Sequence, residues 1–438
     1  MDIQQPGKGP VPNIQYPLLP PARILVPIPM FGFRELQYEK RNPPTNPFWQ
    51  FVLGLLERQR RSPPMALVPA VDVTLARAHF ELRPPSVSLG LLAVFRNEAQ
   101  IMTEWVRHYR HEGVTQFVVV SDNSTDGGDD VARSLGLTVF EKDPDLVDQA
   151  AVYSRYLPFV TTDWLLIADL DEFMFARQPE GAASETIVSY LSRLDATPMG
   201  RQCGSIQVPW TLYASSNATR HPVSAIGSQQ YRVARTEARR GTINFKSLTR
   251  RSRMCSHNPA WVHTSATMDS YCLPTDPPTV RTDVNFSCAD WDQMHDVVPT
   301  PASVRDKLTR LWSNISFYLG IPPAPDHVLK VNHYVLQSWE FWCKVKEGRN
   351  SLFGGADTKV QPGGLPADHS QAYYEYYNSL FSAAYDDELY RKRGAAFVAD
   401  LPRRRAWPPE SETANHTYEC DRAAPLHPVY PKGPHPTK

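Results

Sequence analysis

The feature that most constrains the fold is a regular alternation of apolar runs and amphipathic segments between residues 89 and 173. Apolar runs at 89–96, 115–120 and 164–170 each end in polar residues, which is typical of buried strands. Between them, apolar residues recur at the spacing of amphipathic helices. This short strand and helix period predicts right-handed crossovers, and therefore a mainly parallel sheet covered by helices.

Individual elements follow from the same patterns. Apolar residues at 101–109 predict a helix, and Gly113 stands where a helix end favours glycine. We also expect a short helix at 129–136, a strand at 137–143 and a helix at 146–160.

Three polar clusters follow predicted strands, namely "FRNE", "SDNSTD" and "DLDEF". In open parallel sheets, ligands bind beyond the carboxyl ends of the strands, so these clusters are candidate ligand contacts. Short side chains such as Asp122 and Asn123 suit ribose hydroxyls or a base edge, although an ordinary Asx turn has the same composition. Asn97 is open to the same two interpretations, and Glu98 could simply begin a helix.

Asp169 and Asp171 follow the apolar run "WLLIA" and are two positions apart. On an extended backbone their side chains would leave the same face. Two adjacent carboxylates repel each other, and a divalent cation between them and an anionic ligand would offset that repulsion. A solvated turn whose acids cap a helix is the alternative. A phosphatase site of DxDx(T/V) type is disfavoured by Phe173, and Glu172 has no assigned role.

The segment "AVFRNEAQIMTEWVRHYRHEGVTQFVVVSDNSTD", followed by "DQAAVYSRYLPF" and "TDWLLIADLDEF", resembles the nucleotide-sugar-binding half of GT-A glycosyltransferases. The resemblance is to glycosyltransferase family 92 and its family 2-like relatives. "FKSLTRR", a histidine-bearing loop at 257–263 and "VNHYVLQSWEFWCKVKEG" follow in the expected order. The matches span about 90 to 350, although "RNE" replaces the commoner "KNE" and 252–300 matches poorly.

The resemblance implies a site, carried over by position. Asp169, Asp171 and His333 would hold a divalent metal, manganese in particular, although His333 could equally be a packed histidine beside Tyr334. Lys246 and Lys344 could neutralise diphosphate charge. The residues implied in nucleotide-sugar binding are Arg96, Asn97, Glu98, Asp122, Asn123, Asp126, Asp169 and Lys246.

The expected fold class is α/β, a GT-A type three-layer α/β/α sandwich with a mixed, mainly parallel central sheet. We expect a Pro-rich N-terminal extension over 1–85, the glycosyltransferase domain over 86–350 and a C-terminal helical segment over 351–401. The Pro-rich tail over 402–438 is expected to be extended or disordered, in a chain with 41 prolines.

The expected activity is metal-dependent transfer of a sugar from a nucleotide diphosphate sugar, a UDP-hexose, to a glycan or glycoconjugate. The resemblance favours inversion, which needs a base for the acceptor hydroxyl. The candidate bases are Asp283, Asp292 and His263, with Asp290 and His295 also eligible. A non-catalytic nucleotide- or glycan-binding module and a metal-dependent phosphoester hydrolase remain alternatives.

The overall composition limits the binding partners and the cellular location that we expect for the protein. Lys and Arg number 46 against 46 Asp and Glu, so net charge gives no case for a nucleic acid partner or an anionic membrane. No apolar stretch is long enough to span a membrane. Six cysteines without CxxC spacing could form disulfides or be buried thiols. The resemblance, these cysteines and five Asn-x-Ser/Thr triplets favour the Golgi lumen or membrane, whereas the absence of a signal anchor favours the cytoplasm if the N-terminus is complete.

Overall fold

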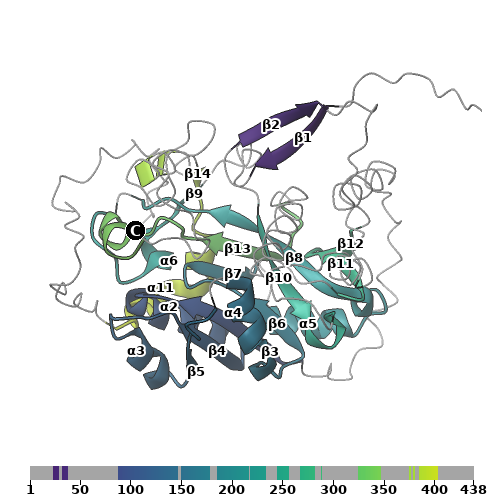
Figure 1. The fold of residues 1–438 in the computed structure, drawn as a ribbon, viewed down its shortest axis with the longest axis horizontal. Helices are drawn as coiled ribbons and strands as arrows, with labels where there is room; N and C mark the ends of the chain where they lie inside the picture. The colour runs from purple at the N-terminus through teal and green to yellow at the C-terminus, as the bar shows by residue number, and fades with distance from the viewer. Residues whose placement is uncertain are drawn as a thin grey trace, which may run out of the picture.

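The computed structural model describes residues 23–28, 32–37, 87–146, 149–177, 185–216, 218–232, 244–255, 267–281, 288, 324–346, 374–375, 378–379 and 384–402. Their main feature is a ten-stranded sheet with helices against it (Figure 1). Its longest path runs in the order β12, β11, β8, β10, β6, β3, β4, β5, and β13 joins β7 to β8. The strands are β3 (Leu89–Phe95), β4 (Gln116–Ser121), β5 (Thr138–Glu141), β6 (Trp164–Ile167), β7 (Glu172–Ala176), β8 (Cys203–Leu212), β10 (Phe245–Arg250), β11 (Ser270–Leu273), β12 (Thr279–Val280) and β13 (Leu329–His333).

The sheet is mixed, and its first half is parallel. β6, β3, β4 and β5 are parallel neighbours, as the alternation with helices predicted. β10 is antiparallel to both β6 and β8, and β13 is antiparallel to β7. The carboxyl ends of β3, β4 and β6 therefore meet at one edge.

Helices cover both faces of this sheet. α2 (Ala99–His111), α3 (Gly128–Ser134), α5 (Ile187–Asp195) and α11 (Glu388–Ala399) share one apolar cluster, and α4 (Gln149–Tyr156) belongs to another. Successive strand side chains point to opposite faces. Leu91 of β3 accordingly packs in the first cluster and Leu92 in the second. The expected three-layer α/β/α arrangement with a mixed, mainly parallel sheet is confirmed.

Short elements complete the described chain. They are β1 (Arg23–Ile28), β2 (Gly32–Gln37), β9 (Tyr231–Arg232), β14 (Ala384–Tyr385), α6 (Ala225–Ser228), α9 (Trp339–Phe341), the 3-10 turns η2 (Leu157–Phe159), η3 (Gly200–Gln202) and η4 (Arg251–Arg253), and the π-turn η5 (Trp342–Lys346). No helix among the described residues combines the length and apolar character needed to cross a bilayer.

The helix end expected at Gly113 is present. α2 ends at His111, and Gly113 has φ of 93°, a left-handed conformation that glycine adopts without a Cβ clash. The β1–β2 hairpin lies inside the extension expected over 1–85 and was not predicted. The expected domain boundaries stay predictions, and the tail over 403–438 lies outside the described residues.

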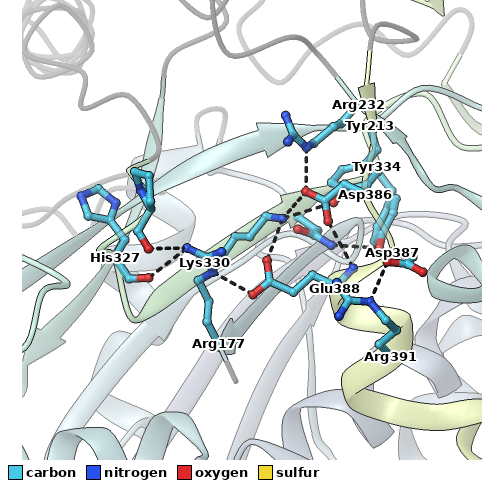
Figure 2. Close-up of polar contacts among 12 residues, drawn as sticks. Arg177, Tyr213, Arg232, His327, Lys330, Tyr334, Asp386, Asp387, Glu388 and Arg391 are labelled. Atoms are coloured by element: carbon cyan, nitrogen blue, oxygen red, sulfur yellow. Dashed lines mark hydrogen bonds and ion pairs between the residues drawn. The ribbon is translucent and has the colours of Figure 1, made fainter. Parts of the chain in front are cut away.

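A network of ion pairs fixes the C-terminal segment against β13, as Figure 2 shows. Lys330 of β13 lies 2.6 Å from Asp386 and 3.4 Å from Glu388, which begins α11. Arg232 of β9 contacts Asp386 at 2.6 Å, and Arg177 contacts Glu388 at 2.7 Å. Because β13 also carries His333, this network helps to position one side of the candidate site.

Candidate active site

The acidic motif forms a turn between two strands. β6 ends at Ile167 and β7 begins at Glu172, so Asp169 and Asp171 do not lie on one extended strand. The backbone N–H of Glu172 donates to the carbonyl of Asp169 at 3.0 Å, and the Glu172 carboxylate accepts from the N–H of Asp169 at 2.8 Å. The expectation that both acids leave the same face of a strand is therefore wrong. The Asp169 side chain is 35% exposed, whereas that of Asp171 is 5% exposed.

Glu172, which had no assigned role, thus closes the turn and binds a buried lysine. Lys246 lies on β10 beyond the end of β6, because the antiparallel register pairs Leu248 with Leu166. Its fully buried Nζ is 2.7 Å from Glu172 Oε2 and 3.2 Å from Asp169 Oδ2. Burial raises the pKa of Glu172 to about 7, although the charge of Lys246 opposes the rise. Burial would lower the pKa of Lys246, but the two carboxylates outweigh it and raise that pKa.

Asp171 has two cationic or potentially cationic neighbours. Lys346, at the end of η5, donates a hydrogen bond from Nζ to Asp171 Oδ2. His333, opposite Glu172 in the pairing of β13 with β7, places Nε2 3.4 Å from Asp171 Oδ1. Burial would raise the pKa of Asp171, but Lys346 and His333 outweigh it and hold this pKa well below its usual range.

The expected metal ligands are close together, but they do not form a complete coordination shell. Among the described residues, no group of three or more His, Cys, Asp and Glu side chains converges on a point where an ion could bind. Asp171 and His333 are near the spacing of adjacent ligands, roughly 3 Å for metal bonds of about 2.1 Å. Asp169 instead contacts Lys246, and it accepts a hydrogen bond from the Tyr153 hydroxyl at 3.3 Å. Glu172 Oε1 and His333 Nδ1 are buried and lie 3.9 Å apart, and neither has a hydrogen-bond partner in the part of the chain that the structure describes. Carboxylate and imidazole groups are suitable ligands for a divalent ion, and Asp171 and His333 are close enough together to bind one. In this structure the cation bound to Asp171 is the Lys346 ammonium.

The loops that follow β3 and β4 are hydrogen-bonded to each other at the same edge of the sheet as this turn. Both carboxylate oxygens of Asp126 accept backbone N–H groups, from Ala99 at 2.8 Å and from Gly128 at 2.9 Å. Asn97, with φ of 54°, accepts from the N–H of Thr125 at 2.7 Å. Asp126 and Asn97 therefore hold the two loops together. Their expected contact with a nucleotide stays a prediction.

The other residues expected to bind nucleotide differ in accessibility. Asp122 is buried and lies 2.6 Å from Lys142 Nζ, and Glu98 is buried at the start of α2. Arg96 and Asn123 are exposed. Only part of the predicted set is therefore open to a ligand in this conformation.

Sequence reasoning missed two residues of the cluster. Lys344 was expected to neutralise diphosphate charge, but it is exposed, and Lys346 two positions later reaches Asp171. Trp210 of β8 is half-buried. The centroid of its ring lies 4.4 Å from the centroid of the His333 ring and 5.9 Å from Lys246 Nζ. The "FWCKVK" pattern placed both lysines on one turn but did not distinguish them. The candidate bases Asp283, Asp290, Asp292, His263 and His295 lie outside the described residues.

Comparison with known proteins gives structural matches only. No family model matches the sequence, and no curated protein matches it. Among solved structures, glucosyl-3-phosphoglycerate synthase from Mycobacterium tuberculosis, in complex with Mn²⁺, UDP and glucosyl-3-phosphoglycerate, matches at 12% identity with a TM-score of 0.25. That match covers 44% of this chain and 66% of the other.

Two further matches are of the same quality. Mannosyl-3-phosphoglycerate synthase from Rubrobacter xylanophilus is 15% identical, with 39% of this chain and 56% of that chain covered and a TM-score of 0.25. S. aureus TarS 1-349 is 14% identical, with 37% and 47% covered and a TM-score of 0.25. The chain thus spans about half to two thirds of these proteins. With TM-scores this low, the matches do not establish a family or an activity for it.

Proposed function

We propose that this chain is a glycosyltransferase that moves a sugar, a hexose, from a nucleotide diphosphate sugar to a glycan or glycoconjugate. The observation that carries the proposal is the cluster of Asp169, Asp171 and Glu172 with Lys246 and His333. It lies at the carboxyl end of β6, where open α/β sheets bind their ligands. The resemblance of the surrounding motifs to GT-A glycosyltransferases supports the same activity.

The cluster suits a diphosphate because it contains fixed positive charge. Lys246 is held by two carboxylates, so its ammonium keeps one place, and Lys346, paired with Asp171, adds a second positive charge. Departure of a nucleoside diphosphate develops negative charge on the phosphates, and preorganised cations stabilise such charge in a water-poor site. Half-buried Trp210 beside His333 offers an apolar surface for a sugar ring.

A divalent ion, for which the family resemblance favours manganese, would be held by Asp171 and His333 with Asp169, and would stabilise the leaving diphosphate as a Lewis acid. UDP as the nucleotide, inversion at the anomeric carbon and a base from Asp283, Asp292 or His263 belong to the same proposal. The resemblance is their only support.

A non-catalytic binding module is the second candidate, and one observation favours it. Neighbouring carboxylates repel each other unless a cation lies between them, but here the ammonium groups of Lys246 and Lys346 already neutralise the acids. The acidic motif alone therefore does not require metal-dependent catalysis. A chain that binds a nucleotide through its lysines without turnover would have the same cluster.

A release assay separates the candidates. The purified chain is incubated with Mn²⁺ and a panel of sugar nucleotides, with and without glycan acceptors, and nucleoside diphosphate is measured. Acceptor-stimulated diphosphate release that is lost in Asp171→Ala is the expected result. Asp130→Ala, whose side chain is 88% exposed on α3, is the matched control and should retain activity.

The other outcomes identify the alternatives. Nucleotide binding without release would favour the module. Release of nucleoside monophosphate or inorganic phosphate would favour the phosphoester hydrolase.

The location we propose is the lumen of the Golgi. Cys203 is disulfide-bonded to Cys272 and Cys255 to Cys288, and Cys343 is also disulfide-bonded. Disulfides persist in oxidising compartments and are rare in the cytosol. Glycan mapping of Asn217 and Asn314 in protein from its native cell tests the location, because finding both wholly unmodified would count against a lumenal protein.

A further inference from the structure

The ion pair between Lys346 and Asp171 gives the cluster a property beyond its ability to bind a diphosphate. Both side chains are largely buried, at 9% and 5% exposure. Asp171 Oδ2 accepts from Lys346 Nζ, and its Oδ1 faces His333 Nε2 at 3.4 Å. Both oxygens of this carboxylate therefore have a partner before any ion arrives.

The turn that carries Lys346 is firmly anchored. Trp342, Cys343 and Val345 of η5 are buried in the apolar clusters, and Cys343 is disulfide-bonded. The backbone of η5 is therefore held by packing, whereas the ammonium is at the end of four methylene groups with rotatable bonds. The charged end can change partner without movement of the turn.

The two lysines of the cluster are held differently. Lys246 contacts two carboxylates, Asp169 and Glu172, and is fully buried. Lys346 pairs with Asp171, whose other carboxylate oxygen faces the His333 imidazole at 3.4 Å. A divalent cation bound by Asp171 and His333 would bring a second positive group beside the Lys346 ammonium in a buried site, and their mutual repulsion favours displacement of the ammonium.

We propose that Lys346 is a built-in counter-ion that competes with divalent cations for Asp171, and that a diphosphate accepts the ammonium when a cation displaces it. This inference rests on the proposed function for its second part only. Cation alone then binds weakly, because Lys346 loses its partner. Cation and diphosphate together bind cooperatively, because each stabilises the arrangement that the other requires.

The main test is a titration of the full chain with Mn²⁺, in which the electron paramagnetic resonance signal of free Mn²⁺ measures how much of the ion is bound. Lys346→Met should bind Mn²⁺ roughly tenfold more tightly than the wild type, because a like charge has left the site. Lys344→Met, on the same turn but exposed, is the matched control and should leave the affinity unchanged. Lys346→Arg should keep the weak binding, and Asp171→Asn should abolish binding. Equal or weaker Mn²⁺ binding by Lys346→Met would overturn the proposal.

The coupling is tested with UDP and with inorganic pyrophosphate as probes. Either should raise the Mn²⁺ affinity of the wild type more than that of Lys346→Met. If both probes leave the wild-type affinity unchanged, the second part of the proposal fails. A tighter Mn²⁺ site in Lys346→Met without sugar transfer would refute the proposed function while supporting the competition.

A measurement on the unaltered chain does not depend on the folding of a variant. An amine-reactive label is applied with and without Mn²⁺, and mass spectrometry compares modification of Lys346 with that of Lys344. Mn²⁺ should increase labelling of Lys346 relative to Lys344, and added pyrophosphate should reverse the increase. Labelling of Lys346 that does not respond to Mn²⁺ would contradict displacement.

Discussion

Glu104 of α2 should make the protein less stable as the pH rises through neutrality. Glu104 is 3% exposed as a whole residue. Its carboxylate accepts hydrogen bonds from the Ser224 hydroxyl and from the N–H groups of Ala225, at 2.8 Å, and Ile226, at 3.3 Å, at the start of α6. Burial raises the pKa of Glu104 from 4.5 to about 7, and these hydrogen bonds only partly oppose the rise. The folded protein therefore holds this proton more tightly than the unfolded chain does.

The size and sign of the effect follow from that difference. The stability that the bound proton contributes is fully present below the unfolded pKa of 4.5 and is lost as the pH rises through the folded pKa near 7. The difference between a pKa of 4.5 in the unfolded chain and about 7 in the folded protein corresponds to roughly 3 kcal/mol, most of it lost between pH 5 and 8. Glutamine keeps an acceptor for the backbone N–H groups and does not ionise, so Glu104→Gln should remove this part of the pH dependence.

The assay is urea unfolding of wild type and Glu104→Gln at pH 5 and pH 8. Between these two pH values, the wild type should lose about 2 to 3 kcal/mol more of its free energy of unfolding than the variant loses. The comparison removes the contributions of other titrating groups, because both proteins share them. Asp130→Asn, which alters an exposed carboxyl on α3, should lose the same amount as the wild type. Equal losses in wild type and Glu104→Gln would show that Glu104 does not hold its proton more tightly in the folded protein than in the unfolded chain.

Two further stability predictions concern the supports of the fold. Glu112→Ala should cost about 3 to 5 kcal/mol in thermal or urea unfolding, because Lys392 and Arg393 would lose their buried counter-ion, and a cost below about 1 kcal/mol would contradict this. Replacing both Cys203 and Cys272 with serine should lower the free energy of unfolding by about 4 kcal/mol, from the loop of 69 residues that the bond closes. An unchanged urea midpoint would mean that this disulfide does not constrain the unfolded chain.

The strand and helix order of the first half of the domain could be predicted because its signals are local. The continuous apolar run at 89–96 reflects a strand that is buried on both faces, and the helical spacing of apolar residues at 101–109 reflects a helix that is buried on one face. Both patterns can be seen directly in the sequence. Leu91 and Leu92 pack on opposite faces as strand geometry requires. The pairing of β13 with both β7 and β8 joins residues far apart in the chain, and no local pattern indicates it.

The composition of the acidic site was predicted better than its geometry. The family resemblance assigned Asp169, Asp171 and Lys246 to one diphosphate site, but the turn depends on a hydrogen bond from the Asp169 N–H to the Glu172 carboxylate. Likewise, Lys344 and Lys346 have the same chemistry, and only the packing of η5 decides that Lys346 faces Asp171. Side-chain direction on a short irregular turn is set by tertiary contacts, so the sequence alone could not assign it.

Transfer of labelled sugar is the most direct test of glycosyltransferase activity in this chain. The wild-type chain and Asp171→Asn are incubated with Mn²⁺, a radiolabelled UDP-hexose and a mixture of glycan acceptors, and label in the glycan fraction is separated from free sugar by chromatography. We predict label in the glycan fraction with the wild type and its loss with Asp171→Asn. Label found only as free sugar or sugar phosphate, or glycan labelling by Asp171→Asn equal to that by the wild type, would contradict it.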